Sequence, residues 1–179
     1  MPLTTYVSGE VLTASSLNAN FTFAAANPAA KFGQIVQTVK SDTYSQSATS
    51  FTDITGYSVS ITPTLASSQV LVVVNAEVGL ADVVVTLRLV RGSTVIYAGT
   101  AASNRPLGFG SAANNSLTGM YSINAFFLDS PATTSATTYK VQMLVNAATG
   151  YLNRTSRDSD TTTLDARTAS SITVIEVLA

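Results

Sequence analysis

Branched apolar residues recur at every second position along Ser68 to Gly92, SQVLVVVNAEVGLADVVVTLRLVRG. A period of two, with many β-branched side chains, favours pleated strands over a helix. The pattern therefore predicts two long strands joined as a hairpin by a tight connection at Gly79-Leu80-Ala81-Asp82. The residues expected to share one face are Val70, Val72, Val74, Ala76 and Val78 in the first strand, and Val83, Val85, Leu87 and Leu89 in the second.

The opposite face of each predicted strand is apolar for about half its length and then becomes polar. The polar positions are Asn75, Glu77, Thr86 and Arg88. A strand that is apolar on both faces must be covered on both, whereas a small sandwich covers only one face of each sheet. We therefore expect the second face to contact another copy of the chain, with these four residues as polar layers of an oligomer interface.

The rest of the chain from Gly33 onward also has the alternation and turn spacing typical of an all-β protein. The fold class predicted is an antiparallel jelly-roll β-sandwich of 8-10 strands over residues 33-179, whose first and last strands lie side by side. Two segments rich in small and polar residues, 99–117 and 153–167, are expected to be loops. The further strands are expected near residues 33–39, 51–54, 57–62, 93–97, 120–128, 139–145, 151–152 and 171–178.

Residues 1-32 have a different pattern and are predicted to form an attachment arm with a short helix. Thr13 is a plausible N-cap and Asn27-Pro28 a helix stop. A lone helix of roughly 12 residues is marginal in water, so it must dock on its own sandwich or on a partner. The side chains expected to make that attachment are Leu12, Leu17, Phe21 and Phe23.

Composition narrows the range of partners. Of 179 residues, 46% are hydrophobic and only 11% charged, against a usual charged share of about 25%. This argues against disorder and suggests extensive contact with other protein. The net charge of −1, with basic residues scattered, gives no reason to expect nucleic acid or an anionic membrane as partner. No apolar run reaches the roughly 18 residues of a membrane helix, and no signal peptide is recognisable, so a cytosolic product is expected.

Catalytic chemistry is hard to find in this sequence. It contains no histidine and no cysteine, which removes the common catalytic triads and zinc ligands. Glu77 and Glu176 could form a distant glycosidase pair, but carboxylates bonded singly to Arg or solvent are the better interpretation. Asp158 and Asp160 could offer oxygens to calcium, although a solvated turn is favoured. We expect no enzyme activity, no cofactor and no metal site.

Two further features have both a functional and an ordinary interpretation. Tyr97, Phe109 and Tyr151 could stack on sugar, but packing within the protein or at an interface is favoured. Three formal glycosylation sequons, at Asn20, Asn114 and Asn153, are expected by chance in a chain rich in Asn, Ser and Thr.

Several stretches resemble a known family. Gly9 to Asn18, GEVLTASSLN, is similar to a segment that recurs near the N-terminus of tailed-phage virion proteins. GQIVQTV from Gly33, ITPTLASSQVLV from Ile61, LVRGSTVI from Leu89 and ASSITVIEV from Ala169 resemble parts of a phage β-sandwich domain. The resemblance implies a tumour-necrosis-factor-like jelly roll that forms a homotrimer on the virion, and it implies no catalytic residues.

Two functions from different classes of attachment follow as hypotheses. The first is a trimeric capsid decoration or cement protein, bound to the shell through residues 1-32 and assembled in the host cytoplasm. The alternative is a short tail fibre or tail-tip adhesin that binds host surface glycan or protein through loops 100-117 and 153-167. A hydrolase on a jelly roll is a distant third.

Overall fold

The structure is a computed structural model that describes residues 13–15, 18, 32–160 and 163–178. The chain divides into two units, Met1–Lys31 and Phe32–Ala179. In the first unit Ala14, Ser15 and Asn18 are helical, and Thr13 directly precedes them. The predicted attachment residues Leu12, Leu17, Phe21 and Phe23 lie outside the described residues, so the helical arm stays a prediction.

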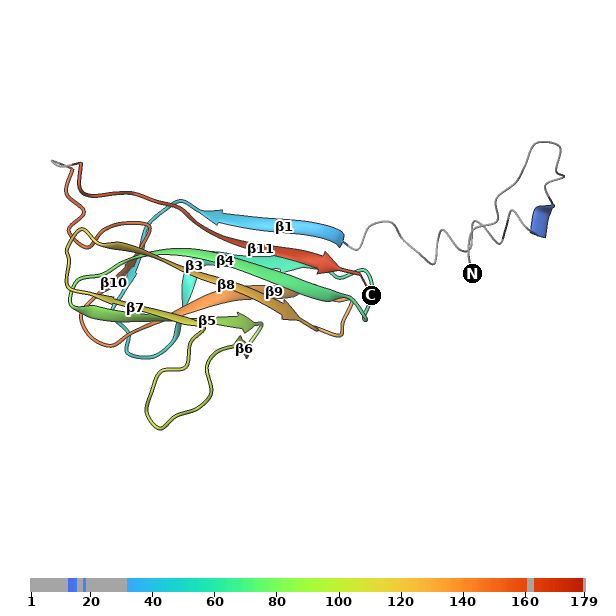
Figure 1. The fold of residues 1–179 in the computed structure, drawn as a ribbon, viewed down its shortest axis with the longest axis horizontal. Helices are drawn as coiled ribbons and strands as arrows, with labels where there is room; N and C mark the ends of the chain where they lie inside the picture. The colour runs from blue at the N-terminus through green and yellow to red at the C-terminus, as the bar shows by residue number, and fades with distance from the viewer. Residues whose placement is uncertain (1–12, 16–17, 19–31, 161–162, 179) are drawn as a thin grey trace. The chain divides into compact units, whose positions relative to one another are not determined.

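The second unit is all-β and consists of two antiparallel sheets (Figure 1). Sheet A contains six strands: β1 (Phe32–Lys40), β11 (Ser170–Val177), β4 (Gln69–Gly79), β8 (Met120–Asp129), β10 (Gly150–Leu152) and β2 (Tyr44–Gln46). Sheet B contains five: β3 (Thr52–Ile61), β9 (Thr137–Val145), β5 (Val83–Arg91), β6 (Thr94–Tyr97) and β7 (Gly110–Asn114).

The strand order is that of a jelly roll, as the sequence predicts. In sheet A, β1 pairs with β11, β11 with β4, and β4 with β8 along its other edge. In sheet B, β3 pairs with β9, β9 with β5, and β5 with β6 and β7 along its other edge. The first and last strands of the unit are therefore neighbours in sheet A, with β1 at its edge.

Two strands in the described part of the chain were not predicted. β2 has only three residues, and β7 lies within the segment predicted as the loop 99–117. Both lack the branched apolar residues that identify a strand in sequence. β7 forms along the free edge of the longer strand β5, whereas β2 pairs with β10, which is equally short.

The predicted hairpin at Ser68–Gly92 is wrong, although both of its strands exist. β4 belongs to sheet A and β5 to sheet B, so Leu80–Asp82 crosses from one sheet to the other. Leu80 is fully buried, and Asp82 turns the chain with a φ of 53°. The apolar faces of β4 and β5 can then meet across the core, whereas a hairpin would leave them side by side in one layer.

The core lies between the sheets and contains the side chains predicted to share a face. β4 contributes Val70, Val72 and Val74, all almost completely buried, and β5 contributes Val85, Leu87 and Leu89. Tyr57 of β3 crosses the core and donates hydrogen bonds to the carbonyls of Asn75 (2.7 Å) and Ser171 (3.1 Å) in sheet A. Burial raises the pKa of Tyr57, so its hydroxyl stays protonated and ties the two sheets together.

A candidate interaction surface on sheet A

The outward side of sheet A, called face A below, carries large apolar side chains. One row runs across four strands, because Ile35 of β1 lies opposite Ile175 of β11, Ile175 opposite Leu71 of β4, and Leu71 opposite Leu128 of β8. The next row contains Gln37, Thr173, Val73 and Phe126. Cross-strand neighbours of this kind lie about 5 Å apart, so the aliphatic side chains form a continuous stripe.

Strand β1 shows the unusual chemistry of face A most clearly. Its outward residues include Phe32, Ile35 and Val39, all exposed, while on its inward side only Val36 is a large apolar residue, next to Gln34, Thr38 and the buried Lys40. An isolated sandwich would be expected to place the larger apolar side chains inward, because a shift of register by one residue exchanges the two faces. The observed register therefore favours a second apolar environment outside sheet A.

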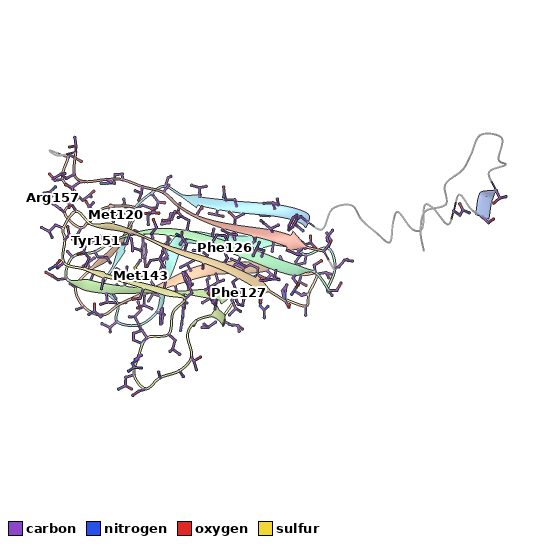
Figure 2. All side chains as sticks on the ribbon, viewed as in Figure 1. Met120, Phe126, Phe127, Met143, Tyr151 and Arg157 are labelled. Atoms are coloured by element: carbon purple, nitrogen blue, oxygen red, sulfur yellow. The ribbon has the colours of Figure 1, made fainter. Side chains whose placement is uncertain are left out.

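Exposure of these side chains is high. Phe126 is 70% and Ile35 64% exposed, and Phe32, Val39 and Leu128 are also exposed. With large side chains offering roughly 150–200 Å² each, these five expose on the order of 500 Å², which is the size of patch that marks interaction sites. Met120, Tyr151 and Arg157 lie toward one end of the sandwich, and Phe126 and Phe127 toward the other (Figure 2).

Face A becomes polar toward the end where β4 finishes and β8 begins. Asn75 donates to Asn124 (2.8 Å) and to Glu77 (3.4 Å), and Ser122 donates to Glu77 (2.5 Å). Among the described outward residues of β1, β4, β8 and β11, Glu77 is the only charged side chain. Two hydrogen bonds hold the Glu77 carboxylate in place, and no cation of the described residues forms an ion pair with it.

The outward side of sheet B, called face B, has the opposite character. Asp53 accepts hydrogen bonds from Lys140 (2.6 Å) and Gln142 (2.7 Å), and Gln142 accepts one from Arg88 (2.7 Å). Burial tends to raise the pKa of Asp53, but the hydrogen bonds from Lys140 and Gln142 hold it below its usual value. Face B therefore satisfies its polar groups within the chain.

The four residues predicted to form oligomer layers do not come together. Asn75 and Glu77 lie on face A, whereas Thr86 and Arg88 lie on face B, on the far side of the core. Thr86 is bonded to Ser111 (3.3 Å), and Arg88 lies over the ring of Phe51 at 4.1 Å. The separation follows from the wrong hairpin prediction, because β4 and β5 belong to different sheets.

Sequence reasoning did not single out Phe126, Leu128, Ile35 and Phe32, which dominate face A. The strands that carry them were predicted, near residues 33–39 and 120–128. What the sequence lacked was the strand order, which places the outward residues of β1 and β8 on the same surface as those of β4.

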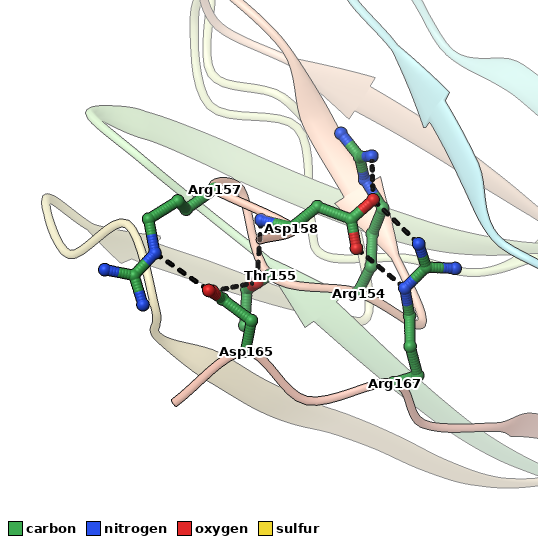
Figure 3. Close-up of polar contacts among 6 residues, drawn as sticks. All are labelled: Arg154, Thr155, Arg157, Asp158, Asp165 and Arg167. Atoms are coloured by element: carbon green, nitrogen blue, oxygen red, sulfur yellow. Dashed lines mark hydrogen bonds and ion pairs between the residues drawn. The ribbon is translucent and has the colours of Figure 1, made fainter. Parts of the chain in front are cut away.

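The loop Asn153–Arg167 is braced internally, as Figure 3 shows. Asp158 accepts hydrogen bonds from Arg154 (2.6 Å) and from Nε and Nη2 of Arg167 (2.7 and 2.8 Å). Asp165 accepts hydrogen bonds from Thr155 (2.6 Å) and Arg157 (2.8 Å). Burial tends to raise the pKa of Asp158, but hydrogen bonding to Arg167 and the charges of Arg154 and Arg167 hold it below its usual value. Both oxygens of Asp158 are thus engaged by guanidinium groups, which disfavours a calcium ion there.

The predicted aromatic residues are packed against the protein. Tyr97 stacks on Phe109 (centroids 5.9 Å apart) and on Phe127 (4.9 Å), and the Arg154 guanidinium lies 4.2 Å from the centre of the Tyr151 ring. Beside Phe109, under the loop from Gly99 to Gly108, lies an open groove of about 440 Å³ with no charged residue in its lining. This groove is the feature that the structure adds to the predicted 100-117 loop.

The structure also places the possible glycosidase pair and one of the glycosylation sequons. Glu176 lies opposite Val70, seven positions along β4 from Glu77, which puts the two carboxylates roughly 20 Å apart, too far for a glycosidase pair. The side chain of Asn153 is fully buried and bonded to Lys40, Asp42 and Ser170, so its sequon offers no free amide. Over the described residues, no group of three or more Asp and Glu gathers as a metal site would require.

Comparison with known proteins adds little. No protein-family model matches the sequence, and no curated protein matches it. A solved structure of infectious bursal disease virus, Gx strain, aligns with 81% of this chain at 10% identity and a TM-score of 0.36, and the chain spans 42% of that structure's chain. A TM-score this low does not show a shared fold. Within the described ranges, no helix combines the length and hydrophobicity needed to cross a membrane.

Proposed function

We propose that the chain is a structural protein of a virion, a homotrimer that decorates or cements a capsid. The observation that carries the proposal is face A, with its row of Ile35, Ile175, Leu71 and Leu128 and the exposed Phe126. In this proposal the protein works by burying a large apolar interface between its subunits, and face A packs around a threefold axis. Obligate interfaces of this kind bury about 2,000 Å² or more and are more apolar than transient ones.

Two further features support an assembly role over catalysis. The carboxylates of Asp158 and Asp165 are paired with arginines, and the described groove beside Phe109 has no acidic or basic side chain in its lining. The sequence stretches that resemble tailed-phage virion proteins give the class of assembly. Residues 1-32, attached at the start of β1, are proposed to grip the shell.

The second candidate is a tail adhesin, and the groove beneath Gly99–Gly108 is the observation that favours it. Its volume lies within the range of small-ligand sites, about 300–1,000 Å³. The uncharged lining is suited to a neutral ligand such as a glycan.

Labelling of the protein in purified virions, followed by electron microscopy, separates the two functions. Label on heads supports decoration, label on tails supports the adhesin, and label on neither contradicts both. Deletion of residues 1–30 is expected to abolish attachment while the trimer persists. Truncated protein that still decorates particles would show that the arm is not the attachment device.

A further inference from the structure

We propose that face A receives the loop Gly99–Gly108 of a second copy of this chain, with Arg105 of that loop placed against Glu77. This inference rests on the proposed self-assembly and names the contact that would set the geometry of the oligomer.

Arg105 stands out among the cations of the described residues. Six of the other Lys and Arg side chains pair with a carboxylate within 4 Å, namely Lys40, Arg91, Lys140, Arg154, Arg157 and Arg167. Arg88 is bonded to Gln142 and lies over Phe51. Arg105 is exposed, and within the described chain its guanidinium makes no hydrogen bond or ion pair.

Hydrogen bonds and ring stacking fix the base of the loop that carries Arg105, and Arg105 lies near its exposed tip. Gly99 donates to the carbonyl of Gly108 (3.1 Å), which closes the base of the loop, and Phe109 donates to Leu87 (2.8 Å) and stacks on Tyr97. At the tip, Arg105 donates its backbone N–H to Ala102 (3.3 Å). The loop projects from the sandwich on the side opposite to β1 (Figure 1).

Glu77 is the complementary charge. It is half-buried on face A, accepts hydrogen bonds from Ser122 and Asn75, and has no ion pair with a Lys or Arg of the described residues. It lies four positions along β4 from Val73, which is opposite Phe126, a distance of about 13 Å. A neighbouring chain that covers Phe126 and extends about 13 Å along β4 would also cover Glu77 and remove water from it. An ion pair between Glu77 and Arg105 would specify register more than it adds affinity.

Because loop and face are different surfaces, the contact is heterologous, and a heterologous contact whose rotation closes makes a ring. This is compatible with the threefold ring of the proposed function. It differs from a symmetric packing of face A on face A, in which two Glu77 carboxylates would approach without a cation.

A charge exchange tests the contact, with the mass of the full chain in solution measured by sedimentation velocity. Glu77→Arg and Arg105→Glu are each expected to weaken self-association about 10- to 100-fold, and the double variant to recover to within a few-fold of the original. Arg105→Lys, which keeps the charge, is expected to retain most of the affinity. Thermal unfolding of each variant checks that the sandwich is intact, and Arg105 lies on an exposed loop where substitution should not affect folding.

Asp82 and Asp160, which are exposed, provide the matched controls. Arg105→Glu combined with Asp82→Arg or with Asp160→Arg is expected to remain weak, and recovery in either would overturn the assignment to Glu77. An assembly that depends on Phe126 but is not restored by the Glu77 and Arg105 exchange would overturn this inference alone. A chain that is monomeric without any substitution would overturn the proposed function as well.

Discussion

Face A and face B are the two outer sides of one sandwich and arise from the same alternation of side chains. They differ in whether their outward side chains find partners within the chain. On face B, Asp53, Lys140, Gln142 and Arg88 bond to one another in a chain across three strands. On face A, Phe126 and Ile35 are largely exposed beside other aliphatic side chains. Face B therefore has its polar groups satisfied at a solvated surface, whereas none of the residues described in 32–160 and 163–178 covers the large apolar side chains of face A.

The difference shows how the interaction surface of a jelly roll without an evident active site can be recognised. Strand alternation alone predicts that each sheet has an inside and an outside. The outward side chains then distinguish two kinds of surface. A solvated surface has polar groups that hydrogen-bond to one another, whereas an interaction surface exposes apolar side chains whose burial against another protein is favourable. By this criterion face A, rather than the hydrogen-bonded part of face B, is the surface proposed to contact another chain.

The largest expected effect comes from placing a charge on face A. Phe126→Asp should weaken self-association by at least about 2 kcal/mol, the usual threshold of an interface hot spot, because a carboxylate would be buried without a partner. The unfolding midpoint of the isolated chain should hardly change, since Phe126 is exposed.

The matched control for Phe126→Asp is Ser60→Asp. Ser60 is also exposed and also on an edge strand, but its outward side is face B, where it bonds to Thr138 (2.7 Å). Sedimentation should show no change in association for Ser60→Asp. Equal effects of the two substitutions would remove the distinction between the faces.

A smaller effect, on folding, is expected at Glu176. This fully buried carboxylate accepts hydrogen bonds from the backbone N–H (2.6 Å) and hydroxyl (2.7 Å) of Thr64, which tie β11 to the β3–β4 connection. Burial tends to raise the pKa of Glu176, but the hydrogen bonds from Thr64 together with those from neighbouring side chains such as Gln34 outweigh it and lower the pKa from 4.5 to about 2.

The sign of the pH dependence follows from that lowered pKa. The stabilisation is present above pH 4.5 and is lost as the pH falls toward 2. Glu176→Gln should therefore lower stability at neutral pH and flatten the loss of stability between these values, as measured by denaturant unfolding across pH. An unchanged pH profile would show that Glu176 does not control the acid limit of sheet A.

The smallest effect is expected on face B. Asp53→Asn removes the charge that Lys140 pairs with at a largely exposed site, where such pairs contribute roughly 0.5 kcal/mol. Denaturant unfolding should show a change of that size, and the association constant should stay the same. A loss of association would mean that face B also contacts a partner.

The sequence predicts the sandwich well because strand alternation is local. The inward residues of β4 and β5 and the pairing of the first strand with the last agree with the structure. The pairing of strands is not local, and there the sequence failed: the short Leu80–Asp82 connection suggested a hairpin but forms a crossing between sheets. As a result Thr86 and Arg88 were grouped with Asn75 and Glu77, from which the core separates them.

Face A could be only half predicted for the same reason. The second apolar side of β4 was visible in the sequence, but the contribution of Phe126, Leu128 and Ile35 depends on β8 and β1 flanking the same sheet. The bracing of Asp158 by Arg154 and Arg167 was equally hidden, since it needs a loop to fold back on itself.

The most direct test of the account is the mass of the unaltered full-length chain in solution, measured by sedimentation equilibrium across the micromolar range. An obligate interface on face A predicts a single species of three chains that persists on dilution. A single species of one chain throughout that range would contradict the account, because Phe126 and the row from Ile35 to Leu128 would then be stable in water without a partner.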